Sequence, residues 1–486
     1  MNTRTRSRSM VPVWLSRLPI LADALGRDHL PARDEASFAK ALDALIDARD
    51  RSEVWLALSV LTGRFPGESL VLETARSSEF DHRALFHAVR GETTRESAAW
   101  RVVVEHEKTL VDVADTSTST LATGIQRVVR EVAKRWATVD SVRFIGWTKD
   151  WQSLRDLEAS EIARVERGTA RGEDEEEATA DVVVVPWRTT YILLEVSAEP
   201  PRSERMRALA RFSGCRTAAL CYDLIPVTSS ETSSPGMTGV FAHYMAALKY
   251  FDRLSTISQA TAVEYLGWRD MLPAAGVTGP DIVPVLLPAS VGDSDEAALE
   301  AARQRLVIGT MPLVLVVGSH EPRKNHLAIL QAAEILWREG HVFSLSFIGS
   351  RSWRGDEFHD RLRQLQEQGR PVESVTKASD TLLWAAYRLA RFTVFPSLNE
   401  GFGLPVAESL AVGTPVVTSG FGSTAEIAAD GGAILVDPRD DDDLTSAMRR
   451  LLTDHDALDR LRGEAENRPR SSWDEYSRDL WQALLA

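Results

Sequence analysis

The sequence predicts an α/β protein with two parallel, doubly wound sheet domains in tandem, preceded by an all-helical segment. Its 486 residues are too many for one core of ordinary size, so two large domains and an accessory segment are expected. From about residue 108 onward, short apolar runs of strand length alternate with helical stretches, which is typical of parallel sheets. Before residue 95 only helical periods occur.

The accessory segment is predicted over residues 1–95. The runs "EASFAKALDALIDARD" and "EVWLALSVLTGRF" repeat apolar residues with helical spacing, and no run of strand character lies between them. The chain starts basic and then becomes apolar, as a secretion signal does, but Arg17 and Asp23 interrupt the apolar stretch. We therefore expect a disordered tail that leads into a helix.

The sheet domains are predicted over residues 96–290 and 291–470. The strand runs of the first are "KTLVDVA", "SVRFIGW", "DVVVVPW", "RTAALCYD", "RLSTIS" and "DIVPVLL". Those of the second are "PLVLVVGS", "FSLSFIGS", "RFTVFPS", "PVVTSG" and "GAILVD". Each set has the strand–helix alternation of a Rossmann-like domain. The acidic stretch 168–180 has no apolar period and should be a solvated surface loop.

Charge and composition exclude several classes of function. The chain has 70 acidic and 56 basic residues, and this net charge of -14 argues against a dedicated nucleic-acid binder or a polybasic membrane binder. No apolar run reaches membrane-spanning length. Cys215 and Cys221 lack metal-ligand spacing and suit a reducing cytosol. The acidic run 437–443 fits a turn and helix start better than a metal site, so no metal is expected.

The first candidate ligand-binding residues lie where a predicted strand ends. In an open parallel sheet, ligands bind beyond the carboxyl ends of the strands. "VVGSHEPRKNHLAIL" ends a strand at Gly318 and places Arg323 and Lys324 in a short loop before a helix. The donor fork of an arginine beside the mobile charge of a lysine suits a diphosphate. The alternative is a solvated basic turn.

The glycine-rich stretch "FPSLNEGFGLPVAESLAVGTPVV", residues 395–417, is the second candidate. Pro405 is tolerated only in the first turn of a helix, so the loop should open directly onto a helix over residues 405–412. The backbone amides of Gly403 and Leu404 would lie at the N-terminus of that helix, which favours an anion. Phe402, beside these amides, and Gly318, at the end of the strand in the first candidate, are predicted to contact the same ligand.

Two carboxylates flank this turn. Glu408 is the only charge in "LPVAESLAVG", and an ionised carboxylate there is costly unless donors such as ligand hydroxyls satisfy it. Glu400 precedes the turn and would face the same cleft. Acceptors on both sides of a phosphate-binding turn suit a nucleotide sugar, which carries hydroxyls at both ends of its diphosphate. The alternatives are a Glu408 that caps or pairs internally and a Glu400 that is an exposed loop acid.

Two further loops carry weaker candidates. Glu426 opens a helix after another strand, where it either favours the helix dipole or meets a ligand. In the first sheet domain, Thr123 and Gln126 have capping-box spacing after the first strand. Gly124 lies between them, and its N–H either contacts a leaving diphosphate or belongs to an ordinary capped helix.

These stretches resemble a known family. "EPRKN" followed by "FPSLNEGFGLPVAESLAVGTPVV" resembles the retaining glycosyltransferases of family four, whose GT-B fold has two Rossmann-like domains facing a cleft. "TGIQRVVR" is similar to bacterial O-antigen and exopolysaccharide mannosyltransferases. "SSWDEYSRDLWQALL" is similar to the last helix of the family, here within 471–486, which crosses back onto the first domain. The resemblance runs from about residue 108 to the end and leaves out the helical segment.

The resemblance implies a role for each candidate in the second domain. Glu400 would hold hydroxyls of the donor sugar, and Glu408 would hold the ribose hydroxyls. Arg323 and Lys324 would bind the diphosphate, assisted by the amides of residues 403–404.

The resemblance also implies first-domain residues at the donor. Gly124 would approach the diphosphate from that side of the cleft. Many relatives have a His-Asp pair where "ALCYDLIP" has Tyr222 and Asp223. Tyr222 can donate a hydrogen bond to a sugar hydroxyl but cannot carry a cation at neutral pH, which puts the role of the histidine in doubt, and Asp223 is carried over only weakly.

The predicted reaction is transfer of a sugar, with retention at the anomeric carbon, from a nucleoside diphosphate sugar to an acceptor hydroxyl. The likeness of "TGIQR" favours GDP-mannose as donor and a glycan or lipid-linked glycan as acceptor. No cofactor, metal or protein nucleophile is implied. The predicted location is the cytoplasm, with at most peripheral contact with the inner face of the plasma membrane.

Other functions stay open at this point. A different GT-B enzyme, such as a sugar-nucleotide epimerase or a phosphorylase, would share the phosphate site. A non-catalytic binding module would use the fold alone, although it has no physical need for both cations and both glutamates. A plain Rossmann dehydrogenase is disfavoured because no G-x-G-x-x-G follows the first strand of either set.

Overall fold

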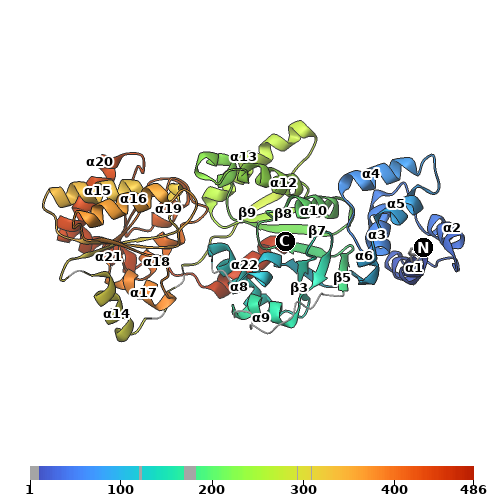
Figure 1. Cartoon of the computed structure of the whole chain (residues 1–486), viewed down its shortest axis with the longest axis horizontal. Coiled ribbons are helices and arrows are strands. Elements are labelled where there is room, and N and C mark those ends of the chain that lie inside the picture. Colours follow the sequence, from blue (N-terminus) through green and yellow to red (C-terminus); the bar gives the residue numbers. More distant parts are fainter. Residues whose placement is uncertain (1–9, 120–122, 169–181, 290, 293, 308) are drawn as a thin grey trace, which may run out of the picture.

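A computed structural model describes residues 10–119, 123–168, 182–289, 291–292, 294–307 and 309–486. Figure 1 shows a helical segment, a first sheet domain and a second sheet domain side by side in chain order. The predicted N-terminal tail over residues 1–9 and nearly all of the predicted acidic loop lie outside the described residues. The α/β class predicted from the sequence is confirmed, with helices first and two sheets after them.

In the described part of the N-terminal segment the regular structure is all helical, as predicted. Its helices are α1 (Val11–Leu25), α2 (Glu35–Leu45), α3 (Arg51–Thr62), α4 (Glu68–Ser77), α5 (Ala84–Glu92) and α6 (Arg95–Ala99). Helix α3 lies at its centre and is buried on nearly all sides. Arg17, which interrupts the apolar run of α1, is buried with it. Its guanidinium donates to the carbonyls of Leu61, Ser97 and Trp100. Burial lowers the pKa of Arg17 to about 10.

The first sheet has nine strands in the order β1-β5-β4-β3-β2-β6-β7-β8-β9. Their bounds are β1 (Arg101–Glu105), β2 (Thr109–Asp112), β3 (Val142–Trp147), β4 (Leu154–Asp156), β5 (Val182–Pro186), β6 (Thr190–Leu193), β7 (Arg216–Cys221), β8 (Arg253–Thr256) and β9 (Asp281–Pro284). The expectation of a purely parallel sheet is wrong here, because β4 pairs antiparallel with β3 and β5. The strands β1, β4 and β6 were not predicted from the sequence.

Helices cover this sheet and connect its strands. They are α7 (Ala114–Thr118), α8 (Gly124–Trp136), α9 (Ala159–Arg167), α10 (Pro200–Phe212), α11 (Ile225–Thr228), η1 (Ser230–Thr232), α12 (Met237–Leu248), α13 (Gln259–Met271) and η2 (Leu272–Ala275). The predicted capping pair starts α8, since the Thr123 N–H donates to Gln126 Oε1 at 3.0 Å. Val128, Val129 and Val132 of α8 are buried against the sheet.

The second sheet has six parallel strands in the order β12-β11-β10-β13-β14-β15. They are β10 (Leu313–Val317), β11 (Ser344–Ile348), β12 (Val372–Val375), β13 (Phe392–Phe395), β14 (Val416–Ser419) and β15 (Ala433–Val436); only β12 was missed from the sequence. The helices are α14 (Glu296–Leu306), η3 (Pro322–Lys324), α15 (His326–Arg338), α16 (Asp356–Glu367), α17 (Asp380–Leu389), α18 (Leu404–Ala411), α19 (Gly422–Ala428), α20 (Asp441–Thr453) and α21 (His455–Glu466). The acidic run starts α20, where the Asp440 carboxylate caps the amides of Asp442 and Asp443.

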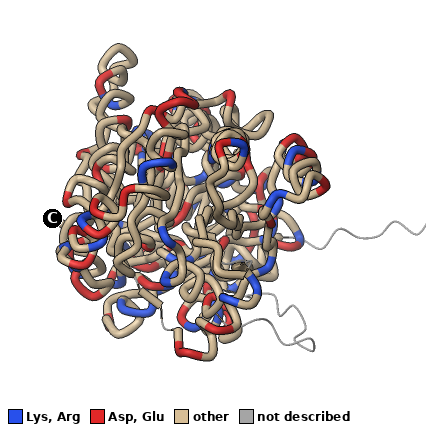
Figure 2. Tube along the Cα trace, turned by 90° about the vertical axis from the view of Figure 1, so that its left-hand side faces the viewer, with Lys and Arg blue, Asp and Glu red and all other residues tan. Residues whose placement is uncertain are grey.

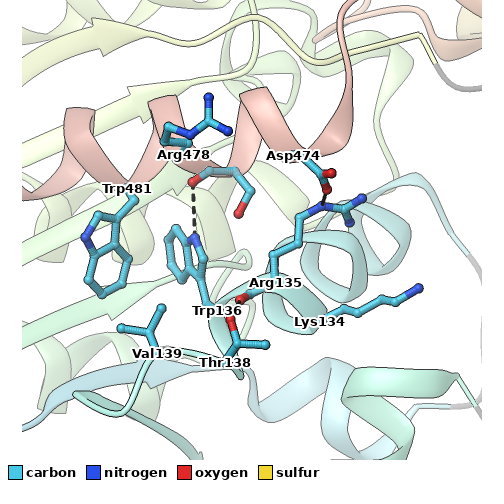
Figure 3. Close-up of a pocket in the computed structure, with 9 residues that line it drawn as sticks. Lys134, Arg135, Trp136, Thr138, Val139, Asp474, Arg478 and Trp481 are labelled. Atoms are coloured by element: carbon cyan, nitrogen blue, oxygen red, sulfur yellow. Dashed lines mark hydrogen bonds and ion pairs between the residues drawn. The ribbon is translucent and has the colours of Figure 1, made fainter.

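The last helix, α22 (Trp473–Leu485), packs on α8, β7 and β8 of the first sheet domain. Figure 3 shows this contact: the indole N–H of Trp136 donates to the Ser477 carbonyl at 3.1 Å, and Arg135 pairs with Asp474. The ring of Trp481 lies edge-on to Trp136, with the ring centroids 4.9 Å apart. An open hollow of about 690 Å³ lies beside these side chains. The end of the chain therefore lies on the first sheet domain.

The charged residues are distributed over the trace. In Figure 2, which views the molecule from the side of the second sheet domain, acidic and basic positions are intermixed. No helix among the described residues is long and apolar enough to cross a membrane. The described residues also contain no group of three or more His, Cys, Asp or Glu side chains placed to hold a metal ion.

Candidate functional site

The candidate site lies where the strand order of the second sheet reverses. The chain runs from β10 through β11 to β12 on one side and then crosses back, so that β13 lies beside β10 on the other. The loops that follow β10 and β13 leave the same edge of the sheet in opposite directions, and ligands of open α/β sheets bind at such a reversal. The first loop carries Arg323 and Lys324, and the second carries Glu400.

These three side chains form one buried ion-pair cluster. Lys324 Nζ lies 2.5 Å from Glu400 Oε1, and Arg323 Nη1 lies 2.7 Å from Glu400 Oε2. The side chains of Lys324 and Glu400 are each only 10% exposed. Both structural alternatives, a solvated basic turn and an exposed loop acid, therefore disagree with the structure.

Neighbouring groups complete the cluster. The Ser397 hydroxyl donates to Glu400 Oε1 at 2.6 Å, and Arg323 also pairs with Glu321 at 2.7 Å. The ammonium of Lys324 lies 4.8 Å from the centre of the Phe395 ring, within cation–π distance. Two cations and two carboxylates thus share a small volume at the sheet edge.

The charge state of Glu400 follows from these contacts. Burial by itself would raise the pKa of this carboxyl, but the charges of Arg323 and Lys324 and the hydrogen bonds from Lys324 and Ser397 outweigh it and lower the pKa to about 2. Burial lowers the pKa of Lys324, although Glu400 opposes the shift. The pKa of Arg323 is raised, because Glu400 and Glu321 outweigh the effect of its burial. Glu400 is therefore ionised at neutral pH.

The glycine-rich loop opens onto α18 as predicted. Gly403 precedes the helix with a φ of 106°, which favours glycine, and Pro405 lies in the first turn. Gly401 packs so closely on the first sheet domain that a Cβ there would collide with the Tyr222 carbonyl oxygen. The Gly401 carbonyl accepts from the Ser258 hydroxyl at 2.6 Å. This loop is therefore held against the first domain.

Phe402 and Gly318 support the loops. The Phe402 ring is buried in an apolar cluster made largely of first-domain residues, so its contribution is to interdomain packing. This differs from the donor contact expected for it. Gly318 follows β10 with a φ of 148° and lies against the stem of Lys324. A side chain at Gly318 would strain the backbone that carries the two cations.

Glu408 is buried in α18 and bonded at both oxygens. Its Oε2 accepts from the Tyr387 hydroxyl of α17 at 2.9 Å, and its Oε1 accepts from Arg127 of the first sheet domain at 2.7 Å. Burial raises the pKa of Glu408, while the charge of Arg127 and the hydrogen bond from Tyr387 oppose the shift. Glu408 is therefore paired within the protein, as the alternative predicts. Tyr387 belongs to the same domain, but Arg127 belongs to the first sheet domain.

The first domain brings three predicted residues to this edge. Asp223 is half-buried and accepts a hydrogen bond from the Ile225 N–H. Burial raises its pKa to about 6, although the charge of Arg323 opposes the shift. The Tyr222 hydroxyl donates to the Leu194 carbonyl at 2.8 Å, so its single hydrogen is already used within the core. Gly124 faces the second domain, with the Leu404 side chain 3.3 Å from the position a Cβ would take.

Glu426 contacts a different helix from the one expected. Its carboxylate accepts from the backbone amides of Gln259 and Ala260, at 3.0 and 3.1 Å, where α13 of the first domain begins. A carboxylate at that position favours the dipole of α13. Glu426 therefore bonds across the domain boundary.

Sequence reasoning missed Arg127, Tyr387 and Ser397 as site residues. Arg127 stands within the quoted "TGIQR", so its signal was present, but its partner Glu408 lies 281 residues further along the chain. Tyr387 and Ser397 are ordinary helix and loop residues by sequence, and only the fold shows that their hydroxyls face Glu408 and Glu400.

Comparisons with known proteins point to glycosyltransferases. Residues 300–468 match the family described as "Glycosyl transferases group 1". The chain is 27% identical over 262 residues to the serotype-specific mannosyltransferase WbdA of Escherichia coli, covering 51% of this chain and 31% of that protein. It is 34% identical over 155 residues to the O-antigen chain mannosyltransferase B of Escherichia coli, covering 31% of this chain and 39% of that protein. The chain thus spans about a third of the length of these relatives.

Solved structures show the same architecture. Anabaena Alr3699/HepE, in complex with UDP and glucose, aligns with a TM-score of 0.56 and 13% identity over 78% of this chain and 99% of its own. The sucrose-phosphate synthase of Thermosynechococcus elongatus aligns with a TM-score of 0.52 and 18% identity over 78% of this chain and 96% of its own. The fold is GT-B, and residues 300–468 are a glycosyl transferase group 1 domain.

Proposed function

We propose that the chain is a retaining glycosyltransferase that moves mannose from GDP-mannose to an acceptor hydroxyl in the synthesis of a cell-surface polysaccharide. The observation that supports this most directly is the buried cluster of Arg323, Lys324 and Glu400 at the strand-order reversal. Glu408 lies eight residues after Glu400, in the helix onto which the same loop opens. These residues would supply cations for a diphosphate and acceptors for two sets of hydroxyls.

The reaction breaks the bond between the anomeric carbon and a phosphate oxygen. The electron pair of that bond goes to the diphosphate, whose growing negative charge Arg323 and Lys324 would stabilise; one well-placed donor is typically worth about 3–4 kcal/mol. The acceptor oxygen bonds to the anomeric carbon from the same face, and its proton passes to the leaving phosphate. No protein nucleophile takes part.

The state of Glu400 fits a positioning role. A carboxylate held by two cations and a hydroxyl, with a pKa of about 2, is a weak base and a weak nucleophile. Lys324, Ser397 and Arg323 use three of its about four acceptor positions, so about one is left for a sugar hydroxyl. Glu400 also holds the Arg323 and Lys324 side chains in place for the diphosphate.

Mannose and GDP are the finer part of the proposal. Both Escherichia coli relatives are mannosyltransferases by name, whereas the Anabaena structure contains UDP and glucose, so the donor base is the quantity to measure first. A glycan or lipid-linked glycan would be the acceptor. We further propose that the enzyme needs no cofactor or metal, and that it works in the cytoplasm with at most peripheral contact with the inner membrane face.

Binding and turnover test the proposal. Calorimetric titration with GDP, UDP, ADP and dTDP should show selective binding of GDP, and incubation with GDP-mannose and a mannan acceptor should yield an α-linked product in the presence of EDTA. Selectivity for another base would overturn the mannose donor, and an inverted product would overturn retention. Lys324→Ala should reduce turnover at least about tenfold, while Lys40→Ala, an exposed lysine on α2, should leave it unchanged.

A further inference from the structure

Arg127 is a first-domain residue that contacts Glu408, the proposed ribose-binding residue of the second domain. It lies on α8, four residues after the Thr123 cap, and its side chain crosses to α18 of the second domain. There Arg127 Nη1 lies 2.7 Å from Glu408 Oε1. The Arg127 side chain is 35% exposed and that of Glu408 is 6% exposed, so a partly exposed cation pairs with a buried carboxylate.

The hydrogen-bond capacity of Glu408 leaves room for a ligand. An ionised carboxylate offers about four lone-pair positions. Arg127 and Tyr387 use one each, on different oxygens. About two acceptor positions remain, and a ribose presents two neighbouring hydroxyls. This count holds only while the carboxyl is ionised, because a protonated carboxyl replaces an acceptor with a donor.

Few groups are available to keep Glu408 ionised. Burial opposes ionisation most strongly, and Asp380 on α17 opposes it as well. The favourable contributions come from Arg127 on α8 and from the hydroxyl of Tyr387 on α17. Arg127 is the cation among these groups, and it belongs to the other domain. The acceptor strength of Glu408 therefore depends on contact between the domains.

We propose that Arg127 is a positioning residue, which orients Glu408 and keeps it ionised as the acceptor of the nucleotide ribose hydroxyls, so that the first domain completes the nucleotide site of the second. This inference rests on the proposed function. It makes nucleotide affinity sensitive to domain contact, because separation of α8 from α18 removes the cation and weakens the ribose site.

The test is a pH series of nucleotide titrations on the intact chain. GDP, UDP, ADP and dTDP are titrated into the wild-type protein and into Arg127→Gln at pH 7.5 and pH 6.0. Arg127→Gln should bind the preferred nucleotide about tenfold more weakly at pH 7.5. It should lose at least about a further threefold at pH 6.0, because Glu408 without its cation takes up a proton more readily. The wild-type affinity should change less over this range.

Two variants separate this role from a structural one. Arg127→Lys keeps the charge and should restore much of the affinity and the flatter pH profile. Arg135→Gln removes another arginine of α8, one that pairs with Glu131 and Asp474, and it should bind as the wild type does.

Each contrary outcome is informative. Equal affinity and equal pH profiles for Arg127→Gln and wild type would overturn the inference while leaving the proposed function standing. Tighter binding by Arg127→Gln would also overturn it, since Arg127 would then compete with the ribose. Failure of the wild-type chain to bind any of the four nucleotides would overturn the proposed function itself.

Discussion

Replacing Glu400 with Gln should destabilise the second sheet domain, because the carboxylate compensates two buried cations. Its pKa of about 2, against an ordinary value of 4.5, corresponds to about 3 kcal/mol of favourable interaction in the folded state at roughly 1.4 kcal/mol per pKa unit. For a domain of this size, that loss should lower the melting temperature by about 6–12 °C. Arg323 and Lys324 would remain buried with fewer partners, which adds to the loss.

The pH dependence of this effect has a defined sign. Since the pKa of Glu400 is lowered in the folded state, its contribution to stability is present above about pH 4.5 and is lost as the pH falls toward about 2. The difference between wild type and Glu400→Gln should therefore be full at pH 7 and shrink below pH 4.5.

Thermal unfolding monitored by calorimetry measures this difference. The matched control is Glu339→Gln, which removes a carboxylate from an exposed pair with Arg449 and should leave the melting temperature nearly unchanged. If both variants melt within a degree of each other at pH 7, the ion-pair cluster does not stabilise the domain and the electrostatic reasoning is refuted.

Three further predictions concern other parts of the site. Glu408→Gln should weaken nucleotide binding, measured by calorimetry, while it changes the melting temperature little. Unchanged affinity with a lower melting temperature would instead assign Glu408 to structure alone. His320 and His326 stand on either side of Arg323 and Lys324 in the sequence, and their rings are in contact. Burial lowers their pKa values to about 4 and about 3. The folded state therefore resists their protonation, and its stability should fall as the pH drops from about 6.5 to about 4. His326→Phe should make that fall shallower in melting experiments over the same pH range, and an unchanged slope would exclude His326 as its source. Gly401→Ala should push the loop away from the Tyr222 carbonyl and reduce turnover about tenfold or more with little loss of fold by circular dichroism, whereas normal turnover would show that the close contact is not needed.

Much of the fold could be predicted because local periodicity reports local burial. The apolar strand runs and the helical segment were found from their spacing, and Pro405 placed the start of α18 to within a residue. The strands β4 (LRD) and β12 (VESV) were not found because they have too few apolar residues to form a run. The strands β1 and β6 were missed although each carries a short apolar run. The antiparallel direction of β4 depends on its neighbours and has no local signal.

The candidate site divides in the same way. The sequence by itself determined which residue types stand at the ends of strands: the adjacent cations, the glycine-rich turn and the two glutamates around it. Only the tertiary structure decided their partners. Glu400 meets Lys324 across 76 residues because β10 and β13 are neighbours in the sheet, and Glu408 meets Arg127 because two domains pack together. The physical reason is that the hydrophobic period of a helix or strand indicates which of its faces is buried. Which residues of other elements contact that face depends on how the whole chain packs.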